Sequence, residues 1–192
     1  PRSTLFPYTT LFRSSYSFGF LPFDKVRDKD SPASICLICE IAAWAKDNGM
    51  TLYDLLMNIY AEYGFSKEST INVVKPGKTG ADEIKQMMVD FRANPPKELG
   101  GEPIVLWKDY QTLEGKKADG SVEKLNMPTT ANVLQWFCAD GTKISVRPSG
   151  TEPKIKFYCE IKDAAFKGAA DYEASLKKAE ARIEAIKKRL SL

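Results

Sequence analysis

Four groups within one short segment could together bind an oxyanion. The segment reads RPSGTEPK at positions 147–154, and the groups belong to Arg147, Ser149, Gly150 and Thr151. An arginine guanidinium offers a planar fork of donors, and hydroxyls rotate freely to donate. A glycine lets a backbone N–H approach a ligand closely. These types and this spacing indicate a phosphate-binding loop, but proline and glycine between strands equally suit an ordinary hairpin.

Two alternating segments flank this loop and must position it. Residues 142–146 precede it and residues 154–162 follow it, and in both of them apolar and polar residues alternate. A period of two predicts a half-buried strand. The pair Asp140-Gly141 before the first of them predicts a tight turn. The loop is therefore expected to join two neighbouring strands of one sheet.

Helix signals are clear in the first third of the chain. Ser31-Pro32 predicts a helix start with serine as the N-cap, and Gly49 predicts its end. Thr51 followed by Asp54 resembles a capping box, which predicts the start of a second helix that ends near Gly64. This pair of helices is typical of the helical end of an α/β layer.

The remaining signals predict a compact α+β domain from Phe65 to the end of the chain. The expected elements are a strand at 69–74, a helix at 81–93, a strand at 103–107, a loop at 114–127, a strand at 131–137 and a last helix from 172 to 190. The last helix carries one apolar stripe with spacings of four and three. Packing of this stripe on the chain's own sheet is predicted, and a coiled-coil partner is the alternative.

The first 14 residues, PRSTLFPYTTLFRS, differ from the rest of the chain. They contain no acidic residue and no helical or strand period. The stretch resembles a translated sequencing adapter, although an authentic flexible N-terminus is the alternative, and it is left out of the fold prediction. The expected organisation is therefore a non-native segment at 1–14, a helical part at 15–64 and the α+β domain at 65–192.

Composition excludes several function classes. The 192 residues are 43% hydrophobic and 28% charged, which is typical of a globular protein with a sizeable core. A net charge of +3 does not indicate nucleic acid or a membrane surface as a partner. No apolar run approaches the roughly 20 residues that span a bilayer.

The chain has four cysteines and no histidine. Cys36 and Cys39 form a C-x-x-C pair inside a predicted helix, and Cys159 alternates with apolar residues on a predicted strand. These positions favour packing as small hydrophobes over a zinc site, which would need all four cysteines. Without histidine, Ser-His-Asp and Cys-His catalysis are excluded. No catalytic residue is predicted in this chain, and reduced thiols without a signal peptide indicate the cytoplasm.

No metal-ligating residue is predicted either, because no Asp-rich loop is evident. The tripeptide Gly77-Lys78-Thr79 resembles the end of a P-loop, but Asn72 stands where that motif needs its first glycine. A turn between a strand and a helix explains the tripeptide.

Two segments together resemble one known family. Residues 138–154 resemble the C-terminal phosphate-binding segment of the α-D-phosphohexomutases, in the form of the bacterial phosphoglucomutases/phosphomannomutases. Ser17-Phe18-Gly19 followed by Arg27-Asp28-Lys29-Asp30 is similar to the end of the family's sugar-recognition loop and the basic segment after it. The two matches occur in the family's order, and the resemblance covers residues 17–192.

The resemblance implies a domain plan. Family enzymes have four domains: a phosphoserine in the first, a magnesium-holding Asp-rich loop in the second, sugar recognition in the third and a phosphate clamp in the fourth. Residues 15–64 would be the tail of the third domain, and residues 65–192 the whole fourth domain, a mainly antiparallel sheet packed by helices. The missing N-terminal domains of the same protein are the implied partners.

The resemblance also implies roles for particular residues. The phosphate-clamp positions fall on Arg147, Ser149, Gly150 and Thr151. The positions that line the sugar–phosphate site fall on Ser17, Arg27 and Lys29. The family places two glutamates just before that serine, where this chain has Ser15-Tyr16. Because this break adjoins the atypical first segment, it indicates truncation.

The implied activity is the magnesium-dependent interconversion of hexose 1- and 6-phosphates through a hexose 1,6-bisphosphate. The substrate would be a phosphorylated hexose, and the magnesium ligands would lie outside this chain. The isolated chain is therefore expected to be inactive. Two alternatives from other classes are a stand-alone phosphosugar-binding module and a structural α+β domain whose loop is merely a turn.

Overall fold

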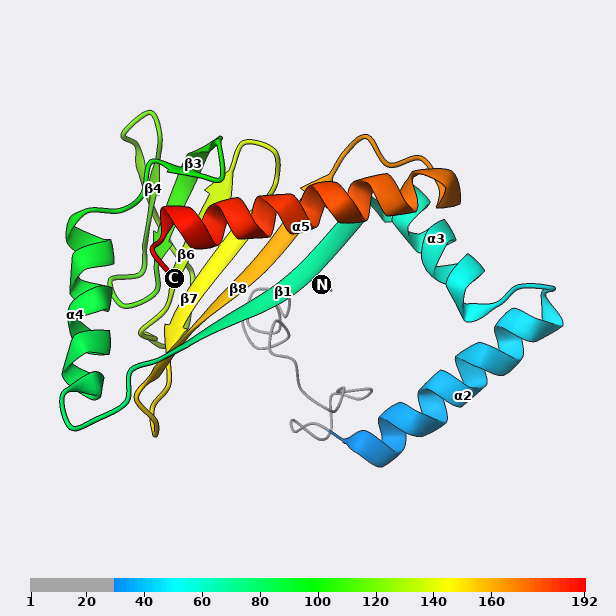
Figure 1. The fold of residues 1–192 in the computed structure, drawn as a ribbon, viewed down its shortest axis with the longest axis horizontal. Coiled ribbons are helices and arrows are strands. Elements are labelled where there is room, and N and C mark those ends of the chain that lie inside the picture. The colour runs from blue at the N-terminus through cyan, green and yellow to red at the C-terminus, as the bar shows by residue number, and fades with distance from the viewer. Residues whose placement is uncertain (1–29) are drawn as a thin grey trace.

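The computed structural model describes residues 30–192 (Figure 1). Ser17, Arg27, Lys29 and the segment 1–14 lie outside the described residues. In chain order, the elements are α2 (Ser31–Asp47), α3 (Leu52–Tyr63), β1 (Phe65–Val74), α4 (Gly80–Ala93), β2 (Glu98–Leu99), β3 (Glu102–Asp109), β4 (Glu114–Lys117), β5 (Val122–Lys124), β6 (Leu134–Cys138), β7 (Lys143–Pro148), β8 (Lys154–Asp163), a short 3-10 helix (Ala169–Asp171) and α5 (Tyr172–Arg189).

One sheet organises the chain from β1 onward. Its strand order is β1-β8-β7-β6-β3-β4-β5, with β2 paired to β3. Every strand pair is antiparallel. This arrangement confirms the α+β class. It also puts β7 and β8 side by side, as the alternating segments around the RPSGTEPK run predicted.

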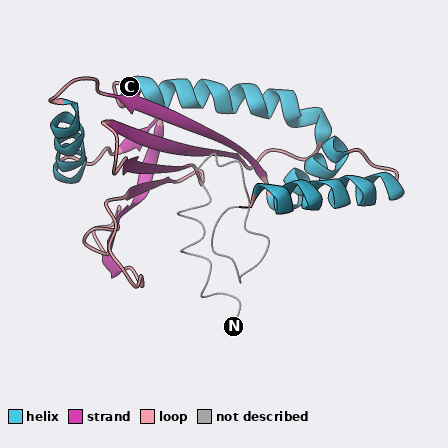
Figure 2. Cartoon of the chain, turned by 90° about the horizontal axis from the view of Figure 1, so that it is seen from below, coloured by secondary structure: helices cyan, strands magenta, loops and turns pink. Residues whose placement is uncertain are grey.

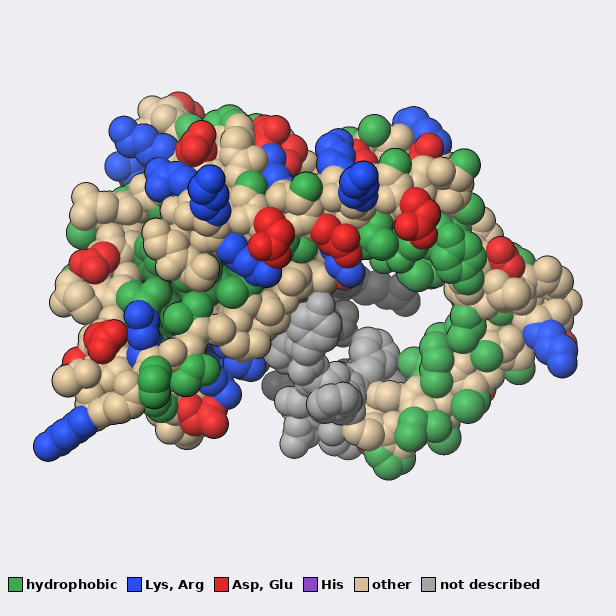
Figure 3. All heavy atoms as spheres, in the orientation of Figure 1, with side chains coloured by type: hydrophobic (Ala, Val, Ile, Leu, Met, Phe, Trp, Pro, Cys, Tyr) green, Lys and Arg blue, Asp and Glu red, His purple; other side chains and the backbone are tan. Residues whose placement is uncertain are grey.

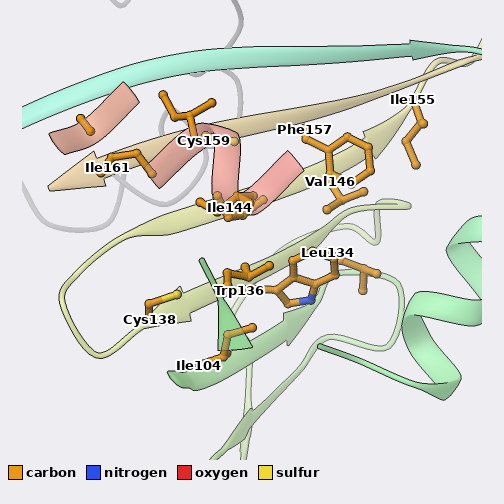
Figure 4. Close-up of a cluster of buried hydrophobic side chains, with 14 of the residues drawn as sticks. Ile104, Leu134, Trp136, Cys138, Ile144, Val146, Ile155, Phe157, Cys159 and Ile161 are labelled. Atoms are coloured by element: carbon orange, nitrogen blue, oxygen red, sulfur yellow. The ribbon is translucent and has the colours of Figure 1, made fainter. Parts of the chain in front are cut away.

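One face of the sheet is apolar and forms the core. Ile144 and Val146 of β7 alternate with polar neighbours, and both are fully buried. They pack with Trp136 of β6 and Phe157 of β8 (Figure 4). The ring of Phe91 from α4 contacts both aromatic rings, at centroid distances of 5.3 Å to Trp136 and 6.0 Å to Phe157. Helices thus cover the face of the sheet to which the apolar residues of the period-two pattern point.

Helix α5 supplies much of that layer. It lies along one side of the sheet (Figures 1 and 2), and it contacts β8, β1 and β2. Ala179, Ile183 and Ile186 are the buried members of its stripe. The prediction that the stripe packs on the chain's own sheet is confirmed, because the sheet occupies the face that a coiled-coil partner would need.

Helices α2 and α3 begin at well-formed caps. Thr51 and Asp54 form the predicted capping box, with both reciprocal bonds present. The N-cap of α2 is Asp30 and not Ser31, since the Asp30 carboxylate accepts a bond from the Ala33 N–H at 3.1 Å. A carboxylate is as good a cap as a hydroxyl, which explains the shift of one residue.

Both helices present apolar side chains to solvent. Figure 3 shows hydrophobic side chains gathered on them. The exposed fraction is 62% for Ile35, 52% for Trp44 and 75% for Tyr63. Ala45 is the buried residue of α2, and Met57 that of α3. Met57 and Tyr60 of α3 pack on the core, but most other apolar side chains of these two helices are not covered by residues 30–192.

The predicted loop at 114–127 was wrong, because β4 and β5 form a hairpin there. The two strands consist of charged residues, one glycine and one valine, and this composition has a low strand propensity. Strands at a sheet edge need little apolar area, and cross-strand charges can hold them. Here Glu123 contacts Lys117 at 3.6 Å and Lys108 at 4.0 Å.

The predicted strand at 131–137 begins later than expected, with Leu134 as the first residue of β6. The residues before it continue the pairing with the end of β3 in irregular form, because the Tyr110 N–H donates to the Val133 carbonyl and the Ala131 N–H to the Tyr110 carbonyl, each at 3.0 Å. The Val133 N–H turns to the Ala131 carbonyl at 2.8 Å, and Arg92 donates to the Asn132 side chain at 2.8 Å.

The four cysteines divide into two pairs. Cys36 and Cys39 are exposed on α2, whereas Cys138 and Cys159 are buried in strands. In residues 30–192 no three His, Cys, Asp or Glu side chains gather where they could hold a metal ion. None of the helices in that range could cross a membrane.

We expect the two pairs of thiols to differ in reactivity. Burial, together with the Asp140 charge, raises the pKa of the Cys138 thiol to about 11. Burial raises the pKa of the Cys159 thiol to about 12. Because the thiolate is the nucleophile, native protein at pH 8 should react with iodoacetamide only at Cys36 and Cys39. In urea all four should react, as mass spectrometry can show. Rapid native labelling of Cys138 would contradict its burial.

Candidate phosphate-binding site

The candidate site lies where β7 passes into β8. Pro148 ends β7 and Lys154 begins β8, so the connecting loop spans residues 149–153. The Ser149 N–H donates to the Lys154 carbonyl at 2.8 Å and closes the loop at its base. The Lys75 N–H donates to the Pro153 carbonyl at 2.9 Å. The loop is thereby fixed both to its own strands and to the chain that follows β1.

Arg147 lies within β7, not within the loop as predicted. It pairs with Lys156 in β8. Its neighbour Val146 is fully buried in the core, whereas Arg147 is exposed. Since successive side chains in a strand point to opposite faces, the burial of Val146 fixes Arg147 on the polar face. A strand holds a guanidinium more firmly than a free loop would.

Ser149, Gly150 and Thr151 follow after Pro148 and form the first part of the loop. The Thr151 N–H donates to the Ser149 hydroxyl oxygen at 3.4 Å, a weak bond that bends the loop. A β-carbon added to Gly150 would meet no atom within 4 Å. Neither crowding nor a left-handed backbone therefore requires glycine at this position. The open space above Gly150 is what a ligand approaching the backbone N–H would need.

The loop also contains a carboxylate, Glu152, that would repel an anion. Its side chain forms an ion pair with Lys154. The hydrogen bond from Lys154 and its positive charge lower the pKa of Glu152. The negative charge of Glu152 is thus offset in part by Lys154.

Lys156 is a site residue that the sequence reasoning missed. It is the direct cross-strand partner of Arg147, and like charges in directly opposite positions of a sheet are destabilising. An anion between them would remove that repulsion. The sequence did indicate that Lys156 lies on the polar face, because it alternates with Ile155 and Phe157, which are both fully buried. Only the strand pairing shows that it meets Arg147.

We expect Lys156→Ala to weaken binding of inorganic phosphate about tenfold, the size of one lost charge-assisted hydrogen bond. Lys162→Ala is the matched control, since it removes the same charge from the same strand and face, six residues away. Calorimetric titration measures both. Equal effects of the two variants would show that only the net charge matters.

The tripeptide Gly77-Lys78-Thr79 is a connection between β1 and α4, as predicted. Gly77 has a φ of 100°, which favours glycine. The Thr79 hydroxyl donates to Glu83 at 3.3 Å. These bonds belong to a helix start, so the tripeptide takes no part in the site.

Comparison with known proteins agrees with this geometry. Residues 108–179, which include the whole RPSGTEPK run, match the family model described as phosphoglucomutase/phosphomannomutase, C-terminal domain. A phosphoglucomutase of Staphylococcus haemolyticus is 36% identical over 152 residues, which are 79% of this chain and 27% of that protein. One from Staphylococcus aureus (strain bovine RF122 / ET3-1) is 37% identical over 153 residues, again 79% and 27%. The chain carries the C-terminal domain of a phosphohexomutase.

The match covers only part of the phosphoglucomutase relatives. The chain spans 27% of the length of these curated relatives. Among solved structures, the open form of parafusin, a phosphoglucomutase from Paramecium, aligns with a TM-score of 0.45 and 19% identity, covering 85% of this chain and 28% of that one. The assignment of this chain to the phosphohexomutases rests on the sequence matches.

Proposed function

We propose that this chain forms the phosphate-binding wall of a phosphohexomutase active site, in a protein that interconverts hexose 1-phosphate and hexose 6-phosphate. The observation that carries the proposal is Arg147, held on the polar face by its strand, with the hydroxyls and open backbone of residues 149–151 beside it. Arginine, hydroxyls and a free N–H are the donors that phosphate oxygens accept from.

This chemistry suits a mutase because phosphoryl transfer depends on positioning and charge stabilisation. The hexose 1,6-bisphosphate must turn so that either phosphate can face the reacting centre. A clamp that contacts only phosphate oxygens accepts both orientations, since it does not contact the carbon that carries the phosphate. Arg147 and Lys156 would bind the distal phosphate while the chemistry takes place elsewhere.

The rest of the site is proposed to lie in other domains of the same protein. By the family resemblance, magnesium and the phosphoserine would supply the transfer chemistry there. Ser17, Arg27 and Lys29, outside the described residues, are proposed to line the sugar–phosphate site. We infer that residues 15–64 are the end of the third domain and residues 65–192 the fourth. The exposed apolar side chains of α2 and α3 support this, because the remainder of the third domain could cover them. A cytoplasmic location fits the unpaired thiols.

Titration of the isotopically labelled chain, followed by NMR, tests the proposal. Glucose 1-phosphate and glucose 6-phosphate should each shift the backbone amides of residues 147–151, and both should shift the same ones. Absence of shifts at millimolar ligand would overturn the clamp. A coupled assay should find no mutase turnover by the purified chain, and turnover would refute the idea that this part only binds.

A further inference from the structure

A polar recess adjoins the proposed clamp on the same face of the sheet. It has a volume of about 380 Å³ and, among the described residues, is lined by Ser69, Thr70, Asn72, Lys156 and Tyr158. The first three come from β1 and the last two from β8. Lys156 belongs both to the recess and to the pair it forms with Arg147. The recess and the clamp therefore share one residue, Lys156.

Strand register gives the distance between Arg147 in the clamp and Asn72 in the recess. Arg147 pairs with Lys156, and Lys156 pairs with Asn72, so the three residues form one row across β7, β8 and β1. Two strand spacings separate Arg147 from Asn72, which is about 10 Å. The next row on this face is Ser145, Tyr158 and Thr70. A phosphate at Arg147 would place a hexose ring attached to it over these two rows.

The chemistry of the lining suits sugar hydroxyls. On the face of Arg147 it presents the amide of Asn72, the phenol of Tyr158, the hydroxyl of Thr70 and the ammonium group of Lys156, and no carboxylate from the described residues. These groups can donate and accept on neighbouring positions, as the hydroxyls of a hexose require. An apolar ligand would find almost no partner there.

Thr70 gives an independent indication. Its hydroxyl oxygen is buried and has no hydrogen-bond partner among the described residues. A buried hydroxyl without a partner is destabilising, and such groups in native proteins call for an explanation. A rotation of the Thr70 side chain about its Cα–Cβ bond would turn this hydroxyl toward the recess, where a ligand hydroxyl would be its partner.

We propose that this recess binds the hydroxyl groups of the hexose whose phosphate is held at Arg147, so that β1 contributes to sugar recognition. The inference rests on the proposed phosphate clamp. Asn72 and Thr70 bind the sugar from β1, and Tyr158 binds it from β8. The ligand class is therefore a phosphorylated hexose, and not phosphate alone.

The test compares two ligands on the 192-residue chain. Dissociation constants for inorganic phosphate and for glucose 1-phosphate are measured by calorimetry on wild type, Thr70→Val and Asn72→Ala. Each variant should bind glucose 1-phosphate about tenfold more weakly, the equivalent of one hydrogen bond, and inorganic phosphate equally well. Ser66→Ala is the control, because it removes a hydroxyl from the same face of β1 outside the recess. It should change neither constant.

Thr70→Val has a second readout. Valine has the same shape and suits a strand, and the hydroxyl it removes makes no bond, so the melting temperature should not fall. Unchanged glucose 1-phosphate affinity in both recess variants would overturn the recess and leave the clamp standing. Equal losses for both ligands would also overturn it. If the wild type binds neither ligand at millimolar concentration, the clamp and the recess are refuted together.

Discussion

Replacing Arg147 with alanine should weaken the binding of glucose 6-phosphate to this chain by at least about 100-fold. The guanidinium can make two charge-assisted hydrogen bonds to a phosphate, and each is worth roughly 1.5–3 kcal/mol. Arg147→Lys keeps the charge but loses the fork, so an intermediate loss of about tenfold is expected. Isothermal titration calorimetry of the three proteins gives the ratios.

The same variant separates a functional loop from a structural one. Arg147 is exposed at the end of β7, so Arg147→Ala should change the free energy of unfolding by less than about 1 kcal/mol. Arg189→Ala is a control, because Arg189 is half-exposed on α5 and its replacement removes the same positive charge. If Arg147→Ala lowers stability and leaves phosphate binding intact, the loop is merely a turn.

Replacing Phe157 with alanine should lower the free energy of unfolding by about 3–5 kcal/mol. Phe157 is fully buried in β8, and its ring is met by that of Phe91. The change removes a large apolar side chain and leaves a cavity between the sheet and α4, where neighbouring strands limit collapse. Urea denaturation followed by circular dichroism measures the effect.

Two variants test whether this loss comes from the core. Phe157→Leu fills most of the cavity, so it should cost less than half as much. Val89→Ala on α4 removes an apolar side chain that is 55% exposed, and it should change stability by about 0.5 kcal/mol or less. A cost for Phe157→Ala similar to that of Val89→Ala would mean that β8 is not the centre of the core.

Much of the fold could be predicted from residues that act locally. Thr51 and Asp54 define a helix start by bonds between near neighbours, and the stripe of α5 needs only the helical period. The β4–β5 hairpin escaped prediction because its stability comes from charges brought together across strands. Glu123 meets Lys108 only after β3 and β4 have paired.

The same distinction applies to the candidate site. The loop residues Ser149, Gly150 and Thr151 are adjacent in sequence, so their types and order were enough to predict them. Lys156 and Asn72 come into one row with Arg147 through strand register, which cannot be read from any short segment of the sequence. The roles of Ser17, Arg27 and Lys29 stay predictions, because these residues lie outside the described part of the chain.

The alternation of buried and partly exposed residues at the start of β8 makes this strand sensitive to a single-residue insertion or deletion. Ile155 and Phe157 face the core, and Lys156 between them faces the polar side. Because the side-chain period is two, a shift by one position exchanges the faces of every residue beyond it. Deleting the codon of Ile155 would carry Lys156 into the core and Phe157 to the polar face. One such frame-preserving lesion would therefore abolish folding and ligand recognition at once, whereas a lesion of the same length within residues 114–127 would spare both.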